Sequence, residues 1–156
     1  IGFLLVIIFM FVKYKIFGLI TNLTLIINLF ILLGILTLFE ATLTLPGIAG
    51  IILTVGMAVD ANVLIFERIK EELKDEKNNI VAFDSGYIKS RTAIIDANIT
   101  TLLAAIILFF MGSGPIKGFS VTLGIGIFTT LFSVYFIARL FTGLYVSKNR
   151  NKEKLI

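Results

Sequence analysis

Two Asp-Ala-Asn triplets interrupt long apolar stretches, and they hold the side chains of this sequence that are best suited to carrying protons. The first triplet, 60–62, lies within MAVDANVLIF and the second, 96–98, within IIDANITTL. A carboxyl group that is withdrawn from water alternates between neutral and charged forms as its access to water changes. The chain has no Cys and no His, which excludes Cys–His nucleophiles, imidazole proton shuttles and most zinc sites. The residue types therefore indicate proton or ion coupling, with no metal site.

Asp60 is the sharper candidate of the two carboxylates. It precedes Glu67, where its helix is expected to leave the membrane, by seven residues. At about 1.5 Å per residue this corresponds to a depth of about 10 Å. An ionised Asp near the centre of a spanning helix costs about 2.5–3.5 kcal/mol. We therefore predict that Asp60 faces protein or water as a proton or ion carrier; the alternative is a permanently protonated or hydrogen-bonded Asp with a structural role.

Asp96 carries a weaker signal. It lies about one turn inside a helix predicted to begin near Thr92, where an acid is favoured by the helix dipole. With Asn98, Thr100 and Thr101 it forms a polar patch on the entering helix. If the helices that carry the two triplets are antiparallel, Asp60 and Asp96 lie at comparable depths. Both a direct role in proton coupling and an accessory role in capping, orienting or hydrating Asp60 remain open for Asp96.

The composition predicts that the helices carrying these residues lie in a membrane. Hydrophobic residues make up 58% of the 156 residues and charged residues 15%, with a mean hydropathy of +1.03. Soluble domains average about 45–50% apolar and about 25% charged residues. The fold class is therefore predicted to be all-α, a polytopic transmembrane helix bundle. The net charge of +4 sits in short hydrophilic segments, as topology signals do, and does not predict a nucleic-acid partner.

We predict one transmembrane domain, 1–156, with five membrane segments. These are 1–12, 18–39, 45–66, 92–111 and 116–145. The first is shorter than the roughly 20 residues that span a bilayer, so we expect it to be the remainder of a truncated helix. The charged segment 67–91 and the tail 146–156 are placed in the cytoplasm by the positive-inside rule, which also makes the C-terminus cytoplasmic.

Local signals define several helix ends. Thr44 is suited to cap the helix 45–66, and Pro46 suits its first turn. The Gly112–Pro115 sequence predicts a turn between two helices. Residues 67–77 are predicted to continue the preceding helix into water, with ion pairs such as Arg68 with Glu72 and Glu71 with Lys74.

Small residues predict where helices pack closely. They recur at i, i+4 spacing on two segments: Gly50, Thr54 and Ala58 on the first, and Thr122, Gly126 and Thr130 on the second. In lipid, ridges of small side chains allow helix backbones to approach each other. Gly56 lies one turn before Asp60 on nearly the same face, so we expect it to leave room beside the carboxylate. Close packing on two faces predicts a central position for helix 45–66.

The polar motifs resemble those of the SecD/SecF family of protein-export membrane proteins. The similar stretches are TLPGIAGIILTVGMAVDANVLIFERIKEEL (44–73), GY (86–87), IIDANITTLLAAIILFFMGSGPIKGFSVTLGIGI (94–127) and the basic tail. Within the family, Val59-Asp60-Ala-Asn62 and Phe66-Glu67-Arg68-Ile69 favour the SecD branch, since an Asn-Asp sequence and Phe-Asp-Arg-Ile are expected in SecF. The resemblance covers essentially the whole chain.

This resemblance implies a protein-transport component of the resistance-nodulation-division superfamily in the bacterial plasma membrane, and no enzyme. The implied energy source is the proton gradient, without a cofactor. The implied partners are SecF, the SecYEG channel, membrane lipid, and an unfolded exported polypeptide gripped by an extracytoplasmic domain. The family template has six spanning helices, so this chain is expected to begin within the second. The Asp of the family's GMAVDAN motif, implicated in proton transport, corresponds to Asp60.

Two other functions remain open at this point. The chain could belong to a proton-coupled small-molecule exporter of the same superfamily, which needs a substrate pathway between helices or in an attached domain. It could also be a passive scaffold of the translocon, in which case Asp60 has no role in transport while Gly50 and Gly126 matter for assembly.

Overall fold

The helices of this protein form a membrane-type bundle, as predicted. The computed structural model describes residues 1–41 and 43–149, and the described residues contain helices and no strands. The elements are α1 (Gly2–Tyr14), α2 (Ile16–Leu38), α3 (Leu45–Asp75), α4 (Asn79–Met111), α5 (Pro115–Phe132), the π-helical turn η1 (Ser133–Ala138) and α6 (Arg139–Lys148). Four described helices are long and apolar enough to cross a membrane: α2, α3, α4 and the continuous run Pro115–Lys148. The predicted tail extends beyond the described residues after Asn149.

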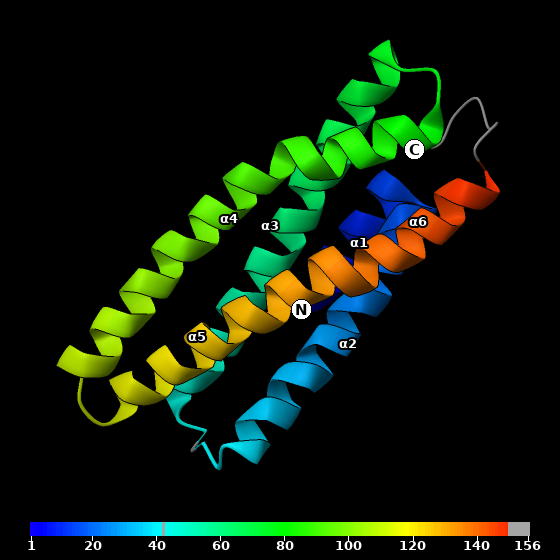
Figure 1. Ribbon diagram of the computed structural model, residues 1–156. Helices are drawn as coiled ribbons and strands as arrows, with labels where there is room; N and C mark the ends of the chain where they lie inside the picture. The colour runs from blue at the N-terminus through cyan, green and yellow to red at the C-terminus, as the bar shows by residue number, and fades with distance from the viewer. Residues whose placement is uncertain (42, 150–156) are drawn as a thin grey trace.

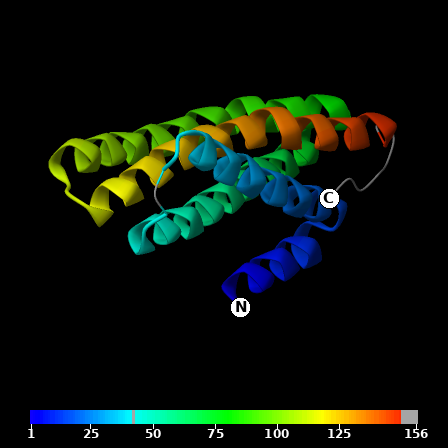
Figure 2. The ribbon, with the colours of Figure 1, turned by 90° about the horizontal axis from the view of Figure 1, so that it is seen from below.

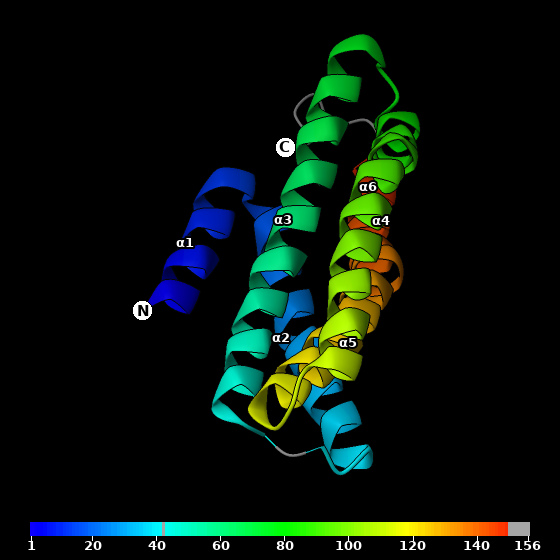
Figure 3. The ribbon, with the colours of Figure 1, turned by 90° about the vertical axis from the view of Figure 1, so that its left-hand side faces the viewer.

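The long helices lie side by side, whereas α1 stands apart. α3 packs mainly against α5 and α4, while α2 contacts α5 and η1 (Figure 1). The N-terminal end of α1 points away from the bundle (Figures 2 and 3). The elbow between α1 and α2 lies at Lys15, whose φ of 54° is in the left-handed region. A Cβ at Gly18 would collide with the carbonyl of Met10, so glycine allows α1 and α2 to meet closely after this elbow.

The predicted signals for helix ends are confirmed at two places. The Thr44 hydroxyl accepts a 3.1 Å hydrogen bond from the backbone N–H of Gly47, and Pro46 occupies the first turn of α3. At the same end of the bundle, where Thr44 reaches the carbonyl of Pro115, α4 ends at Met111 and α5 begins at Pro115. The turn between them uses Gly114 with a φ of 57°, a conformation that favours glycine.

The prediction that the fourth helix starts near Thr92 is wrong, because α4 begins 13 residues earlier, at Asn79. Its N-cap is Asn78, whose side chain accepts a 3.0 Å hydrogen bond from the N–H of Ile80. The added helix buries Ala82, Phe83 and Tyr87, residues at helical spacing that α3 and α6 cover. Segment 67–91 is thus a packed helical hairpin, and only its outer face is solvated.

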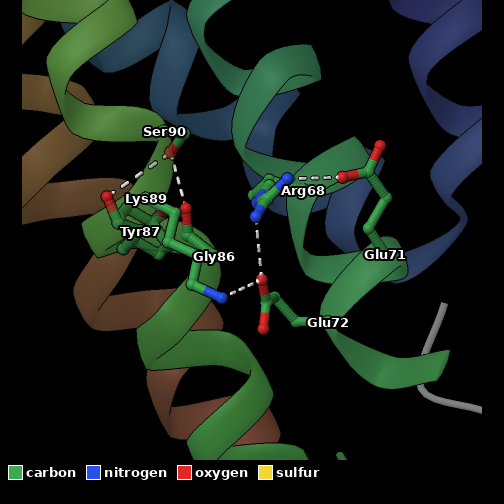
Figure 4. A network of polar contacts seen from close by, with 7 residues as sticks. All are labelled: Arg68, Glu71, Glu72, Gly86, Tyr87, Lys89 and Ser90. Carbon is green, nitrogen blue, oxygen red and sulfur yellow. Dashed lines mark hydrogen bonds and ion pairs between the residues drawn. The ribbon is translucent and has the colours of Figure 1, made fainter. Parts of the chain in front are cut away.

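Ion pairs join the two arms of this hairpin (Figure 4). Arg68 contacts Glu71 at 2.7 Å and Glu72 at 3.2 Å, which confirms the predicted pair with Glu72. The predicted pair of Glu71 with Lys74 is wrong: in the described residues Glu71 pairs with Arg68 instead. Glu72 also accepts a 2.7 Å hydrogen bond from Lys89 on α4, and this bond lowers the pKa of the Glu72 carboxyl. Beside these charges, a Cβ at Gly86 would collide with Ile69, so glycine sets the close approach of α4 to α3.

The predicted small-residue contact joins α3 to α5. A Cβ at Gly50 would lie 3.3 Å from Thr122, and one at Gly126 would collide with Thr54. Ala58 is buried on the same helix, as expected. Gly56 takes no part in this packing: it is exposed, and an added Cβ there meets no atom within 4 Å. Small residues therefore bring α3 close to α5, while Gly56 marks an open side of α3.

Candidate proton-coupling site

Asp60 lies on an exposed side of α3, at a groove between α3 and α4. The groove has a volume of about 90 Å³, enough for more than one water molecule. It is lined by Met57, Asp60, Ala61, Leu64, Ile94, Ala97, Asn98 and Thr101. Among the described residues, no cation or hydrogen-bond donor is paired with the Asp60 carboxyl group. This carboxyl is therefore open to whatever lies outside this face, whether water, lipid or another chain.

Asn98 places a buried hydrogen-bond acceptor in the wall of the same groove. Its side-chain N–H donates to the carbonyl of Ile94 at 2.7 Å, one turn earlier on α4. Its Oδ1 is buried and has no partner among the described residues. A buried acceptor without a donor costs about 1–3 kcal/mol, so a donor in the groove would be stabilised there. A water molecule or the protonated form of the Asp60 carboxyl is such a donor.

The two Asn residues of the triplets behave alike within their helices. The side-chain N–H of Asn62 donates to the carbonyl of Ala58 at 2.9 Å, and its Oδ1 is likewise buried and unpartnered among the described residues. Asn62 does not line the groove that contains Asp60. The repeated spacing thus produces the same local hydrogen bond twice, but only Asn98 shares a groove with Asp60.

Asp96 lies elsewhere, and the expectation that it sits in the first turn of its helix is wrong. It is exposed, and it is not among the residues that line the groove of Asp60. Because α4 begins at Asn79, Asp96 is in the middle of the helix, beyond the first turn over which the N-terminal dipole acts. Antiparallel packing does bring 57–64 of α3 beside 94–101 of α4, but of the two polar residues of the second triplet it is Asn98, and not Asp96, that lines the groove.

Sequence reasoning missed a second buried polar cluster. Asn28 on α2 donates to the Thr130 hydroxyl at 3.5 Å, and its Oδ1 accepts a 3.2 Å hydrogen bond from the Ser133 hydroxyl. All three residues are buried. Ser133 is also the first residue of η1, a π-helical turn of a kind that is frequent at functional sites. An Asn in the centre of an apolar segment was the available signal.

Comparison with known proteins agrees with this helical membrane architecture. A model of the family described as protein export membrane protein SecD/SecF, C-terminal, matches residues 1–148. Protein translocase subunit SecD of Magnetococcus marinus is 51% identical over 152 residues, covering 97% of this chain and 29% of that protein. SecD of Rickettsia prowazekii is 52% identical over 153 residues, covering 98% of this chain and 30% of that protein.

A solved structure is also similar. The crystal structure of SecDF, a translocon-associated membrane protein from Thermus thermophilus, superposes with a TM-score of 0.89 at 42% identity, covering 98% of this chain and 21% of that chain. The chain described here thus spans about 30% of the length of the SecD relatives above. It is a helical membrane protein by composition and fold, and it belongs to the SecD/SecF family of protein export membrane proteins.

Proposed function

We propose that this chain forms the membrane-spanning part of a Sec translocase subunit that uses the proton gradient to assist protein export, with Asp60 as the proton carrier. One observation carries the proposal: Asp60 is exposed at a groove that Asn98 also lines, and within the described part of the chain neither the Asp60 carboxyl nor the Asn98 Oδ1 has a partner. An unpaired carboxyl next to a small polar groove is able to exchange a proton with water while remaining attached to a spanning helix.

The proposed cycle depends on where the charge of Asp60 is tolerated. When Asp60 is protonated, its hydroxyl has an acceptor available in the groove at Asn98. When Asp60 is ionised, the charge is costly against lipid, so this state favours an arrangement in which water or a polar partner surface covers the α3–α4 face. Proton uptake and release then shift the balance between two arrangements of the helix bundles, and this movement is coupled to export.

The proposed partner on this face is SecF, and the proposed neighbour is the SecYEG channel. The similarity to SecDF, described as translocon-associated, supports this assignment, as does the identity of about 50% to SecD proteins. The exported polypeptide is proposed to bind a part of the protein outside this chain. We place the protein in the bacterial plasma membrane with the charged α3–α4 hairpin in the cytoplasm, because Lys and Arg concentrate at that end of the bundle.

The test replaces Asp60 by Asn in the complete translocase. The matched control is Asp96→Asn, which removes a carboxylate from the same bundle outside the groove. Export into inverted membrane vesicles is measured with and without a proton gradient. Loss of the gradient-dependent increase in Asp60→Asn, with normal amounts of assembled complex and a normal response in Asp96→Asn, supports the proposal. Normal stimulation in Asp60→Asn refutes it.

A further inference from the structure

Arg139 lies against α4 at the charged end of the bundle, where α4 packs on α6. The guanidinium of Arg139 lies 3.8 Å from the carboxylate of Asp84 and 5.1 Å from the ring centre of Tyr87. The Arg139 and Asp84 side chains are 41% and 53% exposed, so this ion pair is long and solvated. Such solvated pairs contribute little to stability and leave most donors of the guanidinium available.

Arg91 approaches the same place from α4. It is exposed, and it forms no ion pair with any residue in the described part of the chain. Arg91 and Arg139 both interact electrostatically with the hydroxyl group of Tyr135 on η1. The Tyr135 ring lies 6.3 Å from that of Tyr87, and Arg91 follows Tyr87 by one helical turn on the same face of α4.

The hydroxyl of Tyr135 is itself unsatisfied. It is buried, and it has no hydrogen-bond partner within residues 1–41 and 43–149. A phenol in the field of two guanidinium groups can donate a hydrogen bond to an anion that those groups attract. Most buried hydroxyl groups have a partner, so an unsatisfied one beside two cations indicates a missing acceptor.

The cluster lies at the boundary between the charged end and the apolar surface. Arg91 directly precedes the apolar part of α4, and Arg139 follows the apolar residues of η1. Exposed apolar side chains flank both arginines: Ile88 on α4, Phe136 on η1 and Leu140 on α6. A ligand here therefore meets cationic groups on one side and surface suited to acyl chains on the other.

We propose that Arg91, Arg139 and Tyr135 bind the phosphate group of an anionic phospholipid. The two planar guanidinium groups suit the phosphate oxygens, and the Tyr135 hydroxyl supplies a further donor. Asp84 opposes this binding, because its carboxylate competes for Arg139. The site is separate from the groove of Asp60, so the inference stands or fails independently of the proposed function.

The test measures lipid binding to the intact protein in its complex, in mild detergent, by native mass spectrometry. Phosphatidylglycerol, phosphatidylcholine and inorganic phosphate are titrated in parallel. The double variant Arg91→Gln/Arg139→Gln is compared with Lys77→Gln/Lys148→Gln, which removes the same charge from two exposed lysines outside the cluster. Because charge-assisted hydrogen bonds contribute about 1.5–3 kcal/mol each, the arginine variant is expected to bind phosphatidylglycerol at least about tenfold more weakly. The lysine variant is expected to remain within about twofold of the unmodified protein, since surface charge alone acts weakly at a distance.

Two single variants make the test specific to the cluster. Asp84→Asn is expected to bind phosphatidylglycerol more tightly, because it frees Arg139. Tyr135→Phe is expected to bind about fivefold more weakly, since it removes one hydrogen bond. Equal weakening in the arginine and lysine variants overturns the proposal, as does equal binding of phosphatidylcholine. Inorganic phosphate that displaces the lipid at the same concentration also overturns it, because the ligand would then be a soluble anion.

Discussion

The hydroxyl of Tyr14 donates a 2.7 Å hydrogen bond to the carboxylate of Glu67, which joins the last residue of α1 to α3 at the end of its apolar section. Lys13 and Lys70 lie 3.3 and 3.7 Å from the same carboxylate. The ring of Tyr14 also packs on Phe66, with ring centres 5.2 Å apart. Because most other side chains of α1 are exposed, this cluster anchors the end of α1 to the bundle.

Replacing Tyr14 by Phe is expected to loosen α1 without disturbing the core. The variant keeps the ring against Phe66 and loses only the hydrogen bond to Glu67, which contributes about 0.5–1.5 kcal/mol. Amide hydrogen exchange, measured by mass spectrometry, is expected to accelerate in Gly2–Tyr14 and to stay unchanged in Pro115–Phe132. Equal exchange in α1 of both proteins would show that the ring contact alone holds this helix.

The bond between Lys89 and Glu72 predicts a pH-dependent stability of the α3–α4 hairpin. Lys89, and to a smaller extent Arg68, lowers the pKa of Glu72 below its unfolded value, so this stabilisation is complete above the unfolded pKa of about 4.3 and is lost as the pH falls through the folded pKa. Lys89→Met is therefore expected to melt below the unmodified protein at about pH 6, and the two melting temperatures are expected to converge as the pH falls through the folded pKa of Glu72.

The matched control for this measurement is Lys74→Met. Lys74 is exposed and belongs to no ion pair in the described residues, so its replacement removes one positive charge without touching Glu72. Its melting temperature is expected to follow that of the unmodified protein at every pH. A difference between Lys89→Met and the unmodified protein that does not shrink as the pH is lowered from about 6 would contradict the assignment to Glu72.

The contact between α3 and α5 depends on the absence of a side chain at Gly126. Gly126→Ala places a Cβ against Thr54 and is expected to destabilise the protein by about 1–3 kcal/mol. Gly124→Ala, on the same helix, meets no atom within 4 Å and is expected to be nearly neutral. Adding Thr54→Ala to Gly126→Ala is expected to recover part of the loss. Thermal unfolding in detergent measures all four proteins; equal effects of the two glycine substitutions would refute this account.

Within the proposed function, Asn98 is expected to support proton transfer at Asp60. Asn98→Ala removes the unpartnered acceptor from the groove, and loss of one hydrogen bond corresponds to about a fivefold decrease in gradient-stimulated export. Asn62→Ala is the control, since it breaks the same type of bond outside the groove. Similar decreases in both variants would indicate that export depends on the side-chain bond to the preceding helical turn. In that case the position of Asn98 in the groove would have no specific effect.

Several features of the fold were predictable because they depend on neighbours in the sequence. Hydropathy over a window of residues is sufficient to predict a helical membrane protein, and Thr44 with Pro46 predicts the start of α3. The glycine turn before Pro115 follows from local backbone preferences. Small residues at i, i+4 spacing correctly indicated the faces of α3 and α5 that pack closely, since this spacing defines one helix face whatever the partner; that Gly50 meets Thr122 is a finding of the structure.

The start of α4 was not predictable in the same way. Residues 79–91 have enough polar side chains to suggest a loop, and their helical pattern becomes informative only when a surface exists to cover Phe83 and Tyr87. That surface is made by the α3 extension and by α6, which follows in the chain more than forty residues later. Tertiary packing therefore converted a charged segment into the second arm of a helical hairpin.

The sequence by itself determined that Asp60 sits in a membrane helix, because this follows from its apolar neighbours and its distance from Glu67. Only the tertiary structure decided that Asn98, and not Asp96, shares its groove. The two residues are two positions apart, which places them about 200° apart around the helix. Which of them turns toward α3 depends on the rotation of α4 about its axis. Contacts with distant segments set that rotation, so it cannot be predicted from the neighbouring residues in the sequence.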